Sequence, residues 1–170
     1  MLPKSYVVFK WAVYALATLG LCALQSLVLC HICVLGLTPF LYPLLPALVA
    51  MFEGSRRGAV FALLFGLCCD LLLPAPFRGF FPIVFRAAAA MAAAAAERLL
   101  SRGFLCGLVV SSLALLVTAA GRMLVQILAG GRYLGLMARI AAGEGLLTLP
   151  ALLLALPLYR AIARRCAADY

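Results

Sequence analysis

Four charged side chains lie within or at the end of apolar stretches of this 170-residue chain. They are Asp70, Arg86, Arg122 and Glu144. An ionised group in apolar surroundings is costly unless it has a partner. Two carboxylates and two guanidinium groups balance in charge, so together they can stay ionised. These residue types favour either a structural ion-pair cluster or a site for a charged ligand.

Other residues that carry chemistry are sparse. The single histidine, His31, excludes a multi-histidine metal site. Cys30 and Cys33 have CxxC spacing without the context of a haem or redox motif, so we interpret them as helix-end cysteines and leave a disulfide open. Glu53 and Asp169 are assigned to an interface and to the terminus, and the serines lack a candidate base. We therefore expect no enzymatic activity, no cofactor and no metal.

The composition decides the class of protein. Hydrophobic residues make up 68% of the chain and charged residues 11%, whereas soluble domains are about half apolar. The sequence therefore predicts an all-α integral membrane protein with one polytopic membrane domain over residues 1–170. Its net charge of +9 comes from basic residues scattered between apolar stretches, which indicates membrane topology and no nucleic-acid partner.

Six apolar stretches approach the length of about 20 residues that a helix needs to cross a membrane. We predict six transmembrane helices over about residues 7–29, 34–52, 58–73, 80–96, 104–128 and 144–162. The second stretch contains Pro39, Pro43 and Pro46, which remove backbone donors and are expected to bend or break it. The fourth is rich in alanine, which permits close helix packing, although a compositional bias of the genome would give the same run.

The distribution of Lys and Arg predicts the orientation. If the N-terminus is cytoplasmic, nine basic residues lie in the inside segments and three, Arg78, Arg132 and Arg139, lie in the outside connections. Both termini are therefore predicted to be cytoplasmic. The basic inside segments favour contact with anionic lipid at that face.

The same orientation places the four charged residues at similar depth. With a rise of about 1.5 Å per residue, Asp70 lies about 6 Å, Arg86 about 10 Å and Arg122 about 9 Å from the outer ends of their helices. Glu144 begins the last helix on that side. We predict that they meet in the outer half of the membrane, where the loss of charge in Asp70→Asn would destabilise the protein. The alternative is that each side chain reaches the interface separately.

Residues 58–90 carry a recognisable pattern, GAVFALLFGLCCDLLLPAPFRGFFPIVFRAAAA. A glycine-spaced apolar helix is followed by Gly66, Leu67, Asp70, Pro76 and Gly79, and then by another apolar helix. This pattern resembles that of the rod-shape-determining MreD family. The closing segment, residues 143–165, is also similar to that family, whereas Phe77 and Arg78 depart from its usual turn.

The resemblance implies a bacterial inner-membrane scaffold of the cell-elongation machinery. It implies six helices arranged like the substrate-binding components of energy-coupling-factor transporters, MreC as the main partner, and links to MreB and to RodA with its transpeptidase. Gly66, Pro76 and Gly79 would then serve helix packing and the turn. An alternative is a substrate-binding subunit of an energy-coupling-factor vitamin transporter, with the four charged residues holding a ligand from outside.

Overall fold

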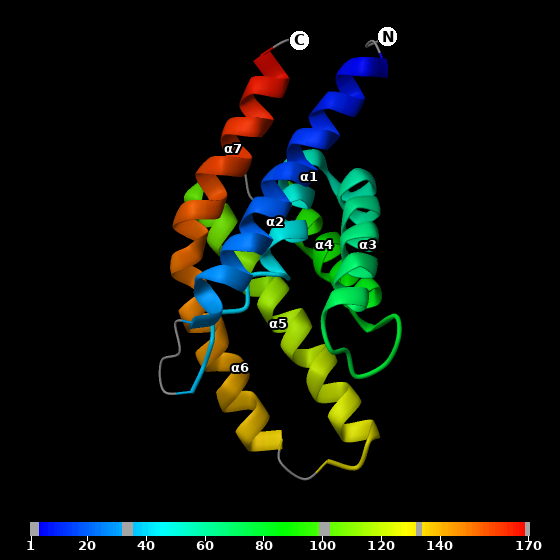
Figure 1. Cartoon of the computed structure of the whole chain (residues 1–170), viewed down its shortest axis with the longest axis vertical. Coiled ribbons are helices and arrows are strands. Elements are labelled where there is room, and N and C mark those ends of the chain that lie inside the picture. Colours follow the sequence, from blue (N-terminus) through cyan, green and yellow to red (C-terminus); the bar gives the residue numbers. More distant parts are fainter. Residues whose placement is uncertain (1–3, 32–35, 99–102, 132–133, 169–170) are drawn as a thin grey trace.

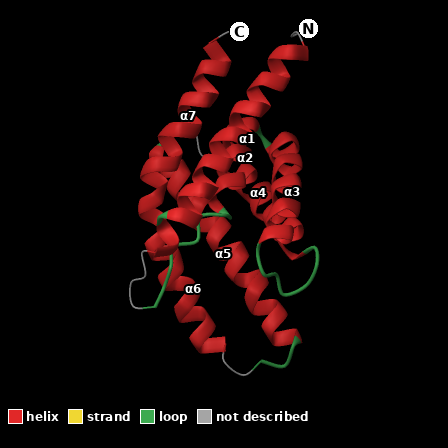
Figure 2. Cartoon of the chain, viewed as in Figure 1, coloured by secondary structure: helices red, strands yellow, loops and turns green. Residues whose placement is uncertain are grey.

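The computed structural model describes residues 4–31, 36–98, 103–131 and 134–168. These residues form helices and loops without a β-strand (Figure 2). The α-helices are α1 (Lys4–Leu27), α2 (Leu44–Glu53), α3 (Ser55–Leu72), α4 (Phe80–Arg98), α5 (Phe104–Leu128), α6 (Leu134–Thr148) and α7 (Leu152–Ala168). Two 3-10 turns, η1 (Leu29–His31) and η2 (Leu149–Ala151), follow α1 and α6.

The helices run up and down along one long axis (Figure 1). The beginning of α1 and the end of α7 lie at the same end of the molecule, and the loop between α5 and α6 lies at the opposite end. Neighbours in the sequence pack against each other, since α3 contacts α4 and α4 contacts α5. α1 packs against α7, so the first and last helices of the chain lie side by side.

The short helix α2 lies at the centre of the fold. Its residues Leu44–Met51 are all buried, and it contacts α3, α4, α5 and α7. A helix that is apolar on all sides is stable only when it is surrounded. Ten residues span about 15 Å, half of a hydrocarbon core of about 30 Å, so α2 alone cannot cross a membrane.

The predicted helix over 34–52 was wrong in its first part, because α2 begins only at Leu44. The described residues before it, 36–43, are not helical. Pro43 occupies the position before the helix, and Pro46 lies in the first turn, where a backbone N–H has no acceptor within the helix. The prolines therefore set where α2 starts.

Side chains from distant helices satisfy the backbone of this non-helical segment. The Gln25 amide donates to the carbonyl of Pro39 at 2.6 Å and accepts from the N–H of Leu41 at 3.3 Å. The N–H of Phe40 donates to Thr148 Oγ1 at 2.8 Å. Irregular backbone is tolerated at membrane depth only when the protein itself satisfies its polar groups.

The prediction of one continuous last helix over 144–162 was also wrong, because two helices cover this region. The structure divides this region into α6 and α7, joined by η2, which contains Pro150. Pro157 lies inside α7, where its missing N–H cannot bond to the carbonyl of Leu153. By contrast, α5 has the predicted bounds, and α1, α3 and α4 agree with the prediction within three residues at each end.

Four segments of the described chain are long and apolar enough to cross a membrane, and they indicate a membrane protein. They are Val8–Leu27, Phe80–Arg98, Phe104–Leu128 and the α6–α7 segment Gly135–Arg165. The predicted count of six spanning helices is not reached, because α2 is short and α3 carries Arg56, Arg57 and Asp70.

Replacement of Gln25 tests its role in holding the non-helical segment. Gln25→Leu leaves the Pro39 carbonyl and the Leu41 N–H without partners in a buried setting. We expect the free energy of unfolding to fall by about 1–3 kcal/mol, measured by thermal or denaturant unfolding in detergent. Gln126→Leu, at an exposed position of α5, is the matched control; an equal effect of both changes would contradict the assignment.

Candidate functional site

The patterned segment at residues 58–90 forms a hairpin of α3 and α4 with a short loop between them. Asp70 lies in the last turn of α3, and its Oδ2 accepts a hydrogen bond of 2.7 Å from the N–H of Gly79, just before α4. Its Oδ1 is buried and has no hydrogen-bond partner among the residues that the structure describes. Gly79 has φ of +91°, a conformation that L side chains rarely adopt. Asp70 therefore closes the loop through a backbone position that favours glycine.

Gly66 sets the distance between the two helices of this hairpin. A Cβ atom placed on Gly66 would lie 2.6 Å from the Cα of Pro82 on α4. No side chain fits at that distance, so the backbones of α3 and α4 touch directly here. Pro76 lies exposed in the loop between the helices. Of the five patterned residues, Gly66, Asp70 and Gly79 thus have direct structural roles, Pro76 restricts the loop, and Leu67 is exposed on α3.

Arg122 and Glu144 form an ion pair, as expected, although Glu144 lies within α6 and does not begin a helix. The guanidinium Nη1 of Arg122 on α5 lies 3.0 Å from Oε2 of Glu144 on α6. The Arg122 guanidinium also lies over the ring of Phe40, 4.3 Å from its centroid. The pair therefore joins α5 and α6 to the non-helical segment before α2.

Asp70 and Arg86, the other two residues of the predicted cluster, form no ion pair with Arg122 or Glu144. The side chain of Arg86 is exposed on α4, and within the described residues no ion pair includes Asp70 or Arg86. Asp70 has a backbone partner instead. The expected contact between Arg122 and Glu144 is present, but the expected start of a helix at Glu144 was wrong. The directions in which Asp70 and Arg86 point from their helices separate them from this pair.

A buried carboxylate at the opposite end of α2 is the polar residue that sequence reasoning missed. The side chain of Glu53 is only 4% exposed. Its Oε1 lies 2.7 Å from Lys10 Nζ and accepts a hydrogen bond of 3.0 Å from the Tyr14 hydroxyl, and its Oε2 lies 3.9 Å from Arg57. We call these four residues the Glu53 cluster. Lys10 and Tyr14 are four residues apart on one face of α1, which was the available signal.

A second polar contact, next to the Glu53 cluster, joins α1 and α7. The hydroxyls of Thr18 and Tyr159 lie 2.8 Å apart, and both side chains are buried. The ring of Tyr159 stacks on that of Tyr14, with the centroids 6.0 Å apart. α1 is thus held to α2 through Glu53 and to α7 through Tyr159.

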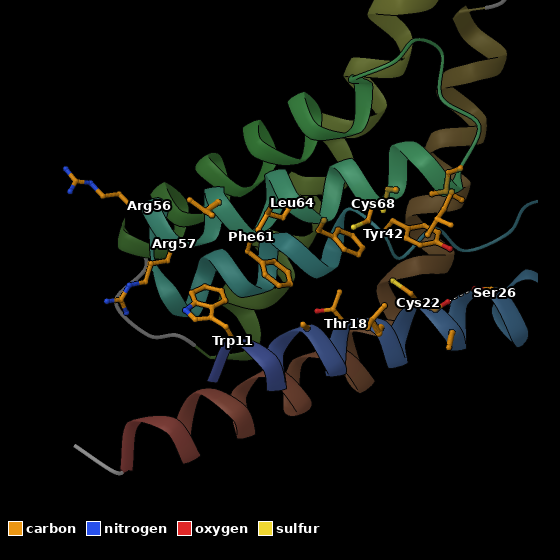
Figure 3. Close-up of a pocket in the computed structure, with 18 residues that line it drawn as sticks. Trp11, Thr18, Cys22, Ser26, Tyr42, Arg56, Arg57, Phe61, Leu64 and Cys68 are labelled. Carbon is orange, nitrogen blue, oxygen red and sulfur yellow. Dashed lines mark hydrogen bonds between the residues drawn. The ribbon is translucent and has the colours of Figure 1, made fainter. Parts of the chain in front are cut away.

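A large groove lies between α1 and α3 (Figure 3). Its volume is about 1150 Å³, and its walls are mainly apolar side chains of these two helices. We call it the α1–α3 groove. Leu19, Val60, Leu64 and Leu72 line it and are more than half exposed, so it opens to the surroundings of the protein. Asp70, Arg86, Arg122 and Glu144 do not line it, so this groove is not the charged ligand site considered from the sequence.

The described residues contain no group of three or more side chains suited to hold a metal ion. Cys22, Cys68 and Cys69 are free thiols. The side chains of Cys30 and Cys33 lie outside the described part of the structure, as does Asp169. The polar side chains of the described site therefore join helices to one another.

The described residues form a helical bundle whose polar residues hold an irregular central segment in place, and four of its apolar segments are long enough to cross a membrane. Comparisons of the chain with protein-family models, curated proteins and solved structures found no match.

Two substitutions separate the hydrogen bond of Asp70 from its charge. Asp70→Leu removes the acceptor for the Gly79 N–H, and we expect it to lower the free energy of unfolding by about 1.5–3 kcal/mol. Asp70→Asn keeps a carbonyl oxygen that can accept this bond, so we expect less than half of that loss. Chemical unfolding in detergent measures both, with Glu97→Gln on the exposed end of α4 as control. Equal losses would mean that the carboxylate charge itself is required.

A double-mutant cycle tests the Glu53 cluster. Lys10→Met leaves the buried Glu53 carboxylate short of its nearest cation, and we expect a loss of about 2 kcal/mol, below that of a fully buried pair because Lys10 is 16% exposed. Glu53→Gln in the same chain should restore part of the loss, since no unpaired charge remains. Arg57→Met, on a 65% exposed side chain, should cost little. Additive effects of Lys10→Met and Glu53→Gln would contradict the pairing.

Proposed function

We propose that this protein is a membrane scaffold of the bacterial cell-elongation machinery, similar to the MreD family, and that it binds an MreC-type partner in the inner membrane. Links to MreB and to RodA with its transpeptidase belong to the same proposal. The observation that carries it is the α3–α4 hairpin. Three of the residues that carry the resemblance have direct contacts there. Gly66 lies against the backbone of Pro82, and Asp70 accepts a hydrogen bond from Gly79, whose positive φ favours glycine.

The use of the polar side chains supports a scaffold in preference to an enzyme. Gln25 and Thr148 bond to the backbone before α2, Glu53 is held by Lys10 and Tyr14, and Arg122 pairs with Glu144. These residues are engaged between helices, so they stabilise one arrangement of the bundle. A rigid bundle suits a protein whose task is to hold partners.

The outward face of α4 is the docking surface that we propose for the partner helix. Its alanine-rich sequence has two faces, since Ala88, Ala89, Ala92, Ala93 and Ala96 are buried in the bundle. Ala87, Ala90 and Ala94 are exposed and are spaced three and four residues apart, with Met91 beside them. Small exposed residues at this spacing let the backbone of a second transmembrane helix come close.

The proposed orientation places both termini in the cytoplasm. The two termini lie at one end of the molecule (Figure 1). Lys10, Arg56 and Arg57 of α1 and α3 and the exposed Arg160 and Arg164 of α7 belong to the helix segments near that end. The excess of basic residues follows the positive-inside rule and favours the anionic lipids of the cytoplasmic leaflet.

Purification of the tagged protein from its own membranes tests the scaffold role. In mild detergent we expect stoichiometric recovery of a bitopic protein with a periplasmic coiled coil, identified by mass spectrometry. Ala90→Trp should reduce this recovery at least about tenfold, since a bulky side chain prevents close helix contact. Ala12→Trp, at an exposed position of α1, is the matched control.

Two outcomes would contradict the proposal. Recovery of a vitamin-like solute together with ATPase subunits would identify a transporter subunit. Partner recovery that is unaffected by Ala90→Trp, in a variant with unchanged thermal stability, would remove α4 as the docking surface.

A further inference from the structure

The α1–α3 groove has the dimensions of a lipid chain. It follows α1 from Trp11 to Ser26, a distance of about 22 Å along the helix. One leaflet contributes about half of a hydrocarbon core of about 30 Å, so the groove can accept an acyl chain over its full depth. Its walls are apolar and open sideways, where membrane lipid can enter.

One end of the groove is basic. Arg56 and Arg57 lie there with Trp11, whereas Cys22, Ser26 and Cys68 lie toward the other end (Figure 3). The side chains of both arginines are exposed, and Arg56 forms no salt bridge within the described residues. Lys10, Arg56 and Arg57 carry three positive charges against the single negative charge of Glu53, so a net charge of +2 remains.

The composition of this end is typical of the lipid head-group level. Tryptophan is enriched at membrane interfaces, and a guanidinium group binds phosphate oxygens through two parallel hydrogen bonds. The basic end also belongs to the helix ends near the chain termini, which we have placed in the anionic leaflet. The charge and the apolar groove thus match the two parts of a single amphipathic molecule.

The rings at the basic end argue against a protein helix as the occupant. Trp11 of α1 stacks on Phe61 of α3, with the ring centroids 6.0 Å apart. A transmembrane helix with side chains is about 10–12 Å wide, so it cannot lie in the groove at this point. An acyl chain is much narrower than a helix and can pass beside the rings.

We propose that the α1–α3 groove binds an anionic phospholipid, with an acyl chain along the groove and the phosphate at Arg56 and Arg57. The site is fixed by the Glu53 cluster, because Lys10 neutralises Glu53 and leaves Arg57 available for the phosphate. This inference rests on the membrane orientation proposed above and not on the scaffold role. The groove and the proposed partner face of α4 belong to different helices, so one can fail without the other.

Quenching of Trp11, the single tryptophan of the chain, measures lipid at the basic end directly. The purified protein is reconstituted in phosphatidylcholine vesicles that contain a small share of either brominated phosphatidylglycerol or brominated phosphatidylcholine. We expect brominated phosphatidylglycerol to quench Trp11 at a several-fold lower share of the total lipid than brominated phosphatidylcholine. The reason is that each arginine at a surface favours anionic lipid by about fivefold. Equal quenching by the two lipids would overturn the proposal.

Two variants, each with a matched control, locate the site. Arg56→Gln with Arg57→Gln should abolish the preference for the anionic lipid, whereas Arg160→Gln with Arg164→Gln on α7 should retain it. Ala23→Phe, at an exposed position that lines the groove, should weaken quenching by brominated phosphatidylglycerol, whereas Ala12→Phe outside the groove should not. A preference that survives the change of Arg56 and Arg57, or equal effects of the two phenylalanines, would overturn the proposal.

A cross-link identifies the occupant in native membranes. A photo-reactive amino acid at position 23 should capture phospholipid. Capture of a polypeptide at this position would instead make the groove a protein interface and would overturn the lipid site. Because the vesicle experiment contains no other protein, its result is independent of whether an MreC-type partner is recovered.

Discussion

The burial of α2 is the constraint on which the rest of the fold depends. A ten-residue helix inside an apolar bundle leaves polar groups at both ends that water cannot satisfy. α1 supplies partners at both ends of α2. Gln25 bonds to the backbone of the segment before α2, and Lys10 and Tyr14 contact Glu53, the last residue of α2. Tyr14 and Gln25 are eleven residues apart, about 16 Å along α1, which matches the length of about 15 Å for α2.

The parts of the fold that sequence could predict are those decided by local properties. Long apolar stretches gave α3, α4 and α5 with bounds within three residues, because each is one uninterrupted helix. The prolines indicated a break before α2, but its position depends on Gln25 and Thr148, which lie far away in the sequence. The division of the last helix into α6 and α7 likewise depends on how Pro150 is accommodated by the bundle.

The candidate site was predictable to a smaller extent. Arg122 pairs with Glu144 as expected, although Glu144 lies within α6 and does not begin a helix. Rise along a helix estimates only depth. It does not give the direction around the helix axis, which turns Arg86 outward, and it cannot show that Asp70 bonds to the backbone of its own loop. Glu53 ends an apolar stretch, so it was assigned to an interface. Its contacts with Lys10 and Tyr14 of α1, which lie far away in the sequence, could not be predicted from that stretch.

The packing of α3 shows why such a bundle belongs in lipid. Its buried positions Gly58, Ala62, Gly66 and Cys69 are small, whereas larger apolar residues on the same helix, Val60, Leu64, Leu67, Leu71 and Leu72, are exposed. In water, burial of large apolar side chains is the main favourable term in folding, so this distribution would be unfavourable. In a membrane the lipid solvates the large residues equally well, and close contact between small residues and backbones holds the helices together. The same outward apolar surface gives α3 a wall that a lipid chain can occupy without displacing any part of the bundle.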